Sequence, residues 1–125
     1  MTRLLVIGCG GFLGAIARYQ VSVWVENRLE SSVPYGTMAV NVLGCLLLGF
    51  LAVWVQARDG LSDDTQLFLK VGLLGAFTTF STLGYETVEL FGDGEWGSAL
   101  VSLVGNLALG LAAVVLGGWL ARGLA

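Results

Sequence analysis

Four hydroxyl side chains surround one aromatic residue in the middle of a long apolar segment, Thr78-Thr79-Phe80-Ser81-Thr82. In lipid, every polar group needs a partner inside the protein or in a water-filled cavity. The four hydroxyls cover all sides of a helix, so they cannot all bond back to carbonyls of the preceding turn. The cluster therefore either packs tightly at a kink or lines a path for something polar. Since broken helices at membrane depth line cavities or lie buried, the pattern favours the path.

The composition is that of an integral membrane protein. The chain has 125 residues, of which 56% are hydrophobic and 12% charged, and its mean hydropathy is +0.83. Soluble domains carry roughly 25% charged residues. Histidine is absent and the two cysteines, Cys9 and Cys45, fall in apolar runs. We therefore expect no disulfide, no transition-metal site and no catalytic triad, which argues against an enzyme. Nothing in the charge pattern points to a nucleic-acid partner.

Four apolar runs approach the roughly 20 residues that cross a bilayer as a helix. They predict an all-α membrane protein with one four-helix transmembrane domain over residues 1–125. The third run contains helix-weakening glycines as well as the hydroxyl cluster, so we predict a break near Gly75–Thr79. Ser62, followed by Asp63 and Asp64, is typical of a helix N-cap with acidic residues in the first turn. The predicted spans are about 4–25, 36–55, 67–91 and 96–120.

Four spans place both termini on one side of the membrane. The positive-inside rule favours a cytoplasmic location for that side, in the plasma membrane. The bias is small, because Arg18 counts toward the other side, and a weak bias permits inverted insertion. Basic residues on the side of the termini are Arg3, Arg58, Arg122 and, near the boundary, Lys70, against Arg28 on the other.

Four helices of this length leave too little surface to enclose a pore, so we expect an oligomer. Pairs of small residues four apart let helix backbones approach closely, and we expect them to have a purely structural role. These pairs are Gly10/Gly14, Gly11/Ala15, Cys45/Gly49, Gly72/Ala76 and Ala113/Gly117.

Polar residues inside the spans each allow two interpretations. Arg18 either faces a cavity or partner, or snorkels from the end of the first span. Asn41 and Asn106 either form hydrogen bonds between helices or aim an amide at a dehydrated anion; for Asn41 alone, the helix contact is favoured. Glu86 lies one turn beyond Thr82 on the same face. Three interpretations are open for it: an ion pair with Arg18, a place in the lining of a vestibule, or simply the polar end of the third span.

Three segments together resemble the Fluc fluoride channels, also called CrcB proteins. Gly10–Tyr19 is similar to that family's first-helix motif, Pro34–Gly44 to its second, and Gly72–Thr82 to its third-helix signature. The three matches occur in the right order within four spans, and the similarity covers nearly the whole chain.

The resemblance implies a dimer of two oppositely inserted subunits, with two fluoride pores at the interface and a structural sodium ion on the two-fold axis. Asn41 and Phe80 match pore-lining positions. The backbone carbonyls of Gly75 and Thr78 match the sodium ligands. Positions matching the hydroxyl-lined path, its vestibule and the first-helix arginine are Ser81, Thr82, Glu86 and Arg18.

One position departs from the family pattern, because Leu83 stands where a second phenylalanine is usual. Leucine lacks the positive ring edge that favours an anion. Two interpretations follow: one pore-lining aromatic per subunit suffices in a homodimer, or a related partner subunit supplies the missing rings in a heterodimer.

Fluoride is a small, strongly hydrated anion, and a narrow pore must replace its water with donors. The Asn41 amide, the hydroxyls and the edge of Phe80 can do so without a fixed cation, which would bind the ion too tightly for release. The sequence thus predicts passive export of cytoplasmic fluoride. Two alternatives are a small four-helix proton-coupled exporter of cationic drugs, with Glu86 as its carboxylate, and a structural membrane subunit.

Overall fold

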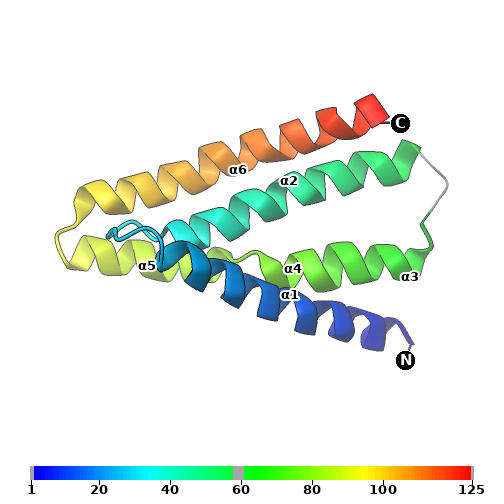
Figure 1. Cartoon of the computed structure of the whole chain (residues 1–125), viewed down its shortest axis with the longest axis horizontal. Coiled ribbons are helices and arrows are strands. Elements are labelled where there is room, and N and C mark those ends of the chain that lie inside the picture. Colours follow the sequence, from blue (N-terminus) through cyan, green and yellow to red (C-terminus); the bar gives the residue numbers. More distant parts are fainter. Residues whose placement is uncertain (1, 58–60, 125) are drawn as a thin grey trace.

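The computed structural model describes residues 2–57 and 61–124, and all regular secondary structure in those ranges is helical. The first two long helices are α1 (Thr2–Glu26) and α2 (Tyr35–Ala57), and the last is α6 (Trp96–Leu124). Both ends of the chain lie at the same end of the bundle (Figure 1). Four helical stretches, counting the composite third one as 63–92, are long and apolar enough to cross a membrane, as predicted.

The third span is a composite of four helical pieces. It comprises α3 (Asp63–Gln66), the π-helical segment η1 (Leu67–Leu74), α4 (Gly75–Phe77) and α5 (Phe80–Gly92). The Ser62 side chain accepts a hydrogen bond from the Thr65 amide, so the predicted N-cap is confirmed. The break falls at Thr78 and Thr79, within the predicted interval. Gly75 itself is helical, with φ −62° and ψ −35°, so hydroxyl residues rather than glycine carry the break.

α1 approaches the third span closely because glycines line the contact. A Cβ added to Gly10 would lie 2.5 Å from the Phe68 carbonyl oxygen, and one added to Gly14 would meet the Leu73 carbonyl. These pairs therefore have the packing role expected for them. A Cβ added to Gly11 would meet no atom within 4 Å among the described residues, so close packing there does not require a glycine.

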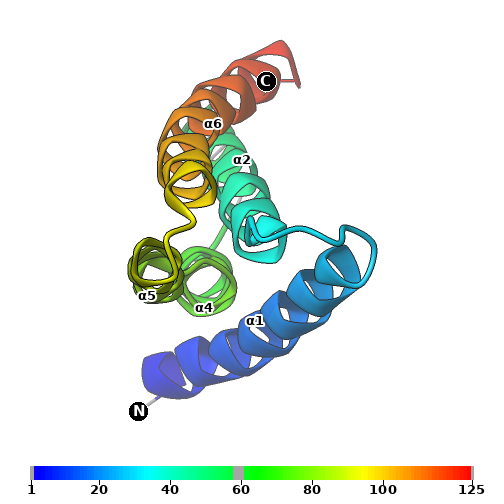
Figure 2. The same cartoon turned by 90° about the vertical axis from the view of Figure 1, so that its left-hand side faces the viewer.

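α2 and α6 pack along most of their length, with the α3–α5 span beside them and α1 on the far side of that span (Figure 2). Gly49 and Gly117 allow this approach, because added Cβ atoms would meet the Val114 and Leu46 carbonyls respectively. The connection from α5 to α6 turns at Gly94, whose φ of +79° favours glycine.

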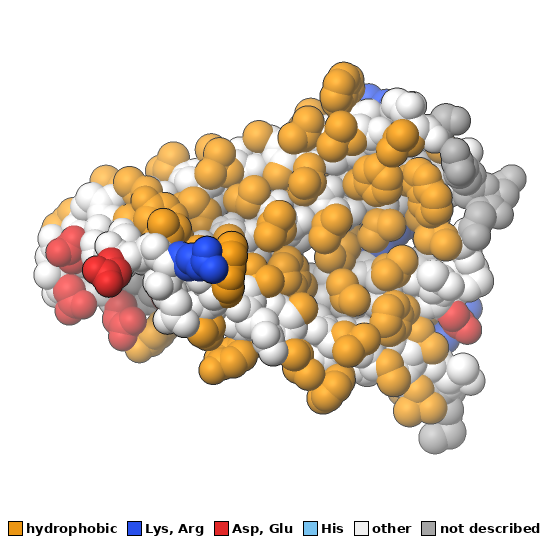
Figure 3. Space-filling model, in the orientation of Figure 1, with side chains coloured by type: hydrophobic (Ala, Val, Ile, Leu, Met, Phe, Trp, Pro, Cys, Tyr) orange, Lys and Arg blue, Asp and Glu red, His pale blue; other side chains and the backbone are white. Residues whose placement is uncertain are grey.

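Hydrophobic side chains cover the sides of the bundle, as expected for a lipid-facing surface (Figure 3). Charged side chains gather at the two ends. The end away from the termini carries acidic residues of the connections, including Glu30, Asp93 and Glu95. At the end with the termini, Arg3 lies 3.7 Å from Asp63 and 3.9 Å from Asp64. This distribution is that of a multi-pass membrane protein.

Candidate functional site at the helix break

The break in the third span is an extended two-residue segment. Thr78 has φ −90° and ψ 159°, and Thr79 has φ −152° and ψ 122°. Thr79 is also the N-cap of α5, since its hydroxyl oxygen accepts from the Thr82 amide at 3.2 Å. The Thr79 hydroxyl donates in turn to Thr82 Oγ1 at 2.9 Å. The local sequence thus ends one helix and caps the next without a glycine.

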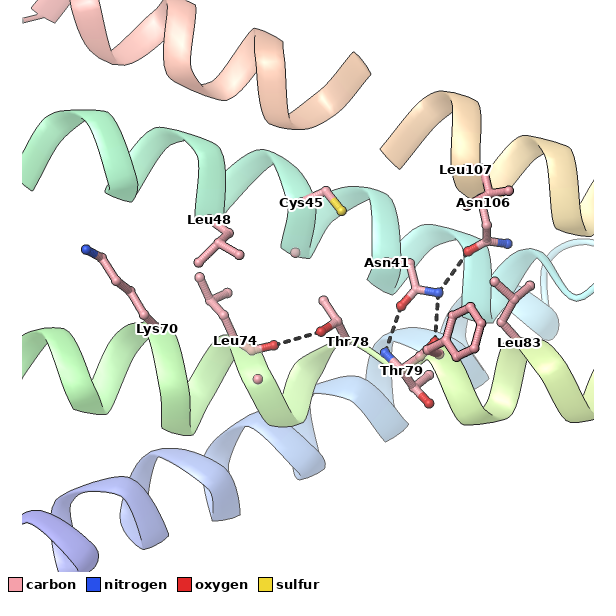
Figure 4. A pocket seen from close by; sticks show the side chains of 13 residues that line it. Asn41, Cys45, Leu48, Lys70, Leu74, Thr78, Thr79, Leu83, Asn106 and Leu107 are labelled. Atoms are coloured by element: carbon pink, nitrogen blue, oxygen red, sulfur yellow. Dashed lines mark hydrogen bonds between the residues drawn. The ribbon is translucent and has the colours of Figure 1, made fainter. Parts of the chain in front are cut away.

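Asn41 of α2 makes three hydrogen bonds at the break, two of them to the broken segment (Figure 4). Its Oδ1 accepts from the Thr79 amide at 2.8 Å, and its Nδ2 donates to the Thr79 carbonyl at 3.0 Å. Nδ2 also donates to Asn106 Oδ1 of α6 at 2.8 Å. Asn106 Nδ2 in turn donates to the Ser102 carbonyl at 2.9 Å. Both asparagines therefore form the inter- and intrahelical contacts that were one of the two interpretations of their sequence.

This network leaves two carbonyls beside the break without their usual helical donors. The Thr79 amide, the i+4 donor for the Gly75 carbonyl, is directed at Asn41 instead. The Thr82 amide, the i+4 donor for the Thr78 carbonyl, is directed at the Thr79 hydroxyl. Carbonyls released at a helix end seek cations, water or other donors. The break therefore presents oxygen ligands at membrane depth.

A cavity of about 290 Å³, which we call the break groove, lies beside this segment among α2, η1, α4, α5 and α6. Phe80 lines it with 78% of its surface exposed, whereas Leu83 is 3% exposed and packed inside the chain. Gly44 gives room for Thr78, whose Cγ2 an added Cβ would meet. The groove is lined by Asn41, Gly44, Cys45, Leu48, Lys70, Leu74, Gly75, Thr78, Thr79, Phe80, Leu83, Asn106 and Leu107.

A second cavity of about 320 Å³, the vestibule, opens toward the end of the bundle away from the termini. Arg18, Thr82 and Glu86 line it together. Thr82 and Glu86 share one helix face, as the sequence predicted. Glu86 Oε1 accepts from the Thr37 hydroxyl at 2.9 Å, and its Oε2 is buried with no hydrogen-bond partner among the described residues. Arg18 makes no ion pair with any residue of ranges 2–57 and 61–124, so of the three alternatives for Glu86 the pair with Arg18 does not form and the lining of a cavity is observed.

The predicted site residues thus divide into two groups. Asn41, Gly75, Thr78 and Phe80 lie at the break groove, and Arg18, Thr82 and Glu86 lie at the vestibule. Ser81 lines neither the break groove nor the vestibule. It is an exposed residue, and its hydroxyl lies 3.4 Å from Thr79 Oγ1.

Thr79 lines both cavities, so the broken segment is the wall between them. No sequence pattern indicated that Thr79 would line both cavities, or that Thr37 would contact Glu86. Both facts depend on which helices become neighbours. A threonine at the start of an otherwise apolar span, such as Thr37, is a weak signal at best.

Comparison with known proteins places this architecture in a family. Residues 5–118 match the family model described as CrcB-like protein, Camphor Resistance (CrcB). The chain belongs to the CrcB family. The resemblance predicted from the three sequence motifs is therefore confirmed over nearly the whole chain.

Similarity to individual CrcB relatives extends from end to end. The chain is 43% identical over 122 residues to the Fluoride-specific ion channel FluC of Chloroflexus aurantiacus. This alignment covers 98% of this chain and 97% of the relative. It is 44% identical over 115 residues to the protein of the same name from Acidobacterium capsulatum, covering 92% of both. A FluC of Thermus thermophilus is also 44% identical, over 92% of this chain and 90% of the relative. The broken span and both cavities fall inside these aligned CrcB lengths.

Proposed function

We propose that this protein is a fluoride-selective ion channel that lets cytoplasmic fluoride leave the cell passively, and is not an enzyme. The observation that carries this proposal is the end-to-end similarity to relatives named fluoride-specific ion channels. The break supports it, because it gathers amide and hydroxyl donors inside the third span, with Lys70 eight residues before Thr78 rather than at the break. Membership of the CrcB family weighs against a drug exporter or a purely structural subunit.

Fluoride recognition would draw on the donors at the break groove. Asn41 Nδ2 and the edge of the Phe80 ring can each replace part of the hydration shell. The Thr78 hydroxyl, which donates to the Leu74 carbonyl at 3.1 Å, would exchange that bond for one to the anion. The two bonds between Asn41 and Thr79 hold the broken segment, so the bond to Asn106 is the one that an anion would exchange. Ser81 and Thr82 continue the hydroxyl-lined path, and Arg18 and Glu86 border its entrance at the vestibule.

A sodium ion would bind where the carbonyls of Gly75 and Thr78 lack helical donors. Both residues line the break groove, and α4 points its carbonyl end there. Carbonyls of interrupted helices are suited to sodium. One chain offers two such oxygens, so a second copy across a two-fold axis would complete the ligand set. In this role sodium supplies a fixed structural charge at the interface.

The functional unit would be a dimer of oppositely inserted subunits in the plasma membrane. Large apolar side chains exposed along α1, α5 and α6 leave ample surface for lipid and for a partner. Both a homodimer and a heterodimer with a related subunit fit this proposal, because the buried Leu83 leaves Phe80 as the aromatic ring exposed to the groove.

Fluoride efflux from liposomes that contain only this purified chain tests the proposal. A fluoride electrode reports the release, and chloride efflux from matched vesicles is the control. Rapid fluoride release with chloride retained is the expected result for a homodimeric channel. Folded protein that releases neither ion would rule out the homomeric channel, and co-reconstitution with a related subunit would then decide whether the chain is half of a heterodimer. Unchanged flux in both Asn41→Ala and Phe80→Ala variants would argue against the proposed pathway.

A further inference from the structure

Lys70 is a basic residue inside the third span, and it has no role in the fluoride pathway proposed above. It belongs to the π-helical segment η1 and is partly buried. Lys70 and Asn41 line opposite ends of the break groove, and Leu48 lies between them on α2 (Figure 4). Lys70 precedes Thr78 by eight residues, or about 12 Å along an α-helix. It therefore lies outside the narrow region at the break.

The Lys70 charge has no acidic partner in the part of the chain that the structure describes. Its Nζ donates to the neutral Gln66 Oε1 at 3.1 Å. The nearest acidic pair along the chain, Asp63 and Asp64, is directed at Arg3 instead. A cation inside a span is costly, so its usual justification is a polar cavity or an ion path.

Lys70 also joins two cavities. It lines the break groove together with Gly75 and Thr78, and it lines a surface cavity of about 330 Å³ with Arg3, Asp63 and Gln66 at the end of the bundle that carries the termini. Because Asp63 pairs with Arg3, Lys70 is the charge in this lining without an opposite partner among the described residues. At the other end, the vestibule contains Arg18 together with Glu26 and Glu86.

We propose that Lys70 is an anion-recruiting residue at the mouth of the break groove, raising the local concentration of the permeating anion without binding it at the narrow break. This inference rests on the proposed channel function. A charge about 12 Å from the break attracts an anion toward the mouth but makes no direct contact in the pore. In an antiparallel dimer, each membrane face would present one Lys70, so an anion would be attracted at both faces.

The test compares initial fluoride efflux of the unmodified chain with that of Lys70→Gln and Lys70→Arg in liposomes. Each is measured at about 10 mM and about 1 M ionic strength, using potassium gluconate at constant fluoride concentration. These conditions change the Debye length from about 30 Å to about 3 Å. Arg122→Gln is the matched control, because Arg122 lies in the last turn of α6 at the same end but lines neither the groove nor the adjoining cavity.

Lys70→Gln is expected to lower efflux about threefold at low ionic strength, the factor for a unit charge about 12 Å away at an effective dielectric constant of about 40. The difference should vanish at high ionic strength, Lys70→Arg should behave like the unmodified chain, and Arg122→Gln should change little. Equal efflux for Lys70→Gln and the unmodified chain at both ionic strengths would overturn the inference and leave Lys70 as a side chain that snorkels to lipid phosphates.

A loss of efflux that persists at high ionic strength would also overturn the inference, because it would show a packing role through Gln66 rather than an electrostatic one. Retention on size exclusion of each variant identifies misfolding as the cause of such a loss. Failure of the unmodified chain to release fluoride would instead contradict the channel function itself, which separates the two failures.

Discussion

The side chain of Asn41 pairs with the backbone of Thr79 as a neighbouring strand would. Its Oδ1 accepts from the Thr79 amide at 2.8 Å, and its Nδ2 donates to the Thr79 carbonyl at 3.0 Å. An extended residue inside a bilayer has lost its helical partners, and leaving both groups unpaired would be costly. One carboxamide supplies a donor and an acceptor in the right geometry. The break is therefore stable because α2 provides an asparagine beside it.

Replacement of Asn41 by alanine should destabilise the protein and abolish flux together. Hydrogen bonds between transmembrane helices average about 0.6 kcal/mol, so loss of three predicts a decrease of about 2 kcal/mol in the free energy of unfolding. Titration with sodium dodecyl sulfate followed by circular dichroism measures it. Asn106→Ala is the control, because it removes the bond to Asn41 but leaves both contacts with Thr79. Equal losses in the two variants would contradict a special role for the Asn41–Thr79 pair.

The sequence predicted most of the architecture because the membrane restricts the choices. Four apolar runs and the Thr78–Thr82 hydroxyls sufficed for four spans and for a break within the interval observed. The π-helical segment at Leu67–Leu74 was not predicted, since no residue type specifies it. The Asn41–Thr79 pairing could not be predicted either, because an asparagine in a span does not reveal which backbone lies opposite.

Substitution of Gly14 should separate α1 from the third span. An added methyl group would meet the Leu73 carbonyl and the Ala76 side chain, and overpacking of this kind costs about 1–3 kcal/mol. Gly14→Ala should therefore lower the thermal midpoint of the detergent-solubilised protein. Gly11→Ala on the same helix has open space and should leave the midpoint unchanged or raise it, since alanine favours helix by up to about 1 kcal/mol. A lowered midpoint for Gly11→Ala alone would place the critical contact elsewhere.

Introduction of a ring at Leu83 tests whether this position limits the channel. Leu83 lines the break groove but is 3% exposed, so the larger side chain must extend into the groove. A ring edge there contributes roughly 0.5–1.5 kcal/mol, which predicts about a twofold to tenfold gain in fluoride efflux for Leu83→Phe. Leu74→Phe adds the same bulk at another buried groove position and should give no gain. Identical efflux for the unmodified chain and Leu83→Phe would show that one exposed phenylalanine per subunit is sufficient.

The contact between Thr37 and Glu86 should couple the start of α2 to the vestibule. Glu86 Oε1 has the Thr37 hydroxyl as its donor at 2.9 Å, whereas Oε2 has no partner among the described residues. Thr37→Val would leave both carboxyl oxygens without a donor, at a cost of about 1–3 kcal/mol, and Thr37→Ser would keep the bond. In a Glu86→Gln background, the cost of Thr37→Val should fall by about 1 kcal/mol, which a double-mutant cycle of unfolding free energies measures. Additive effects would show that Thr37 and Glu86 act independently and that the vestibule wall is held by helix packing alone.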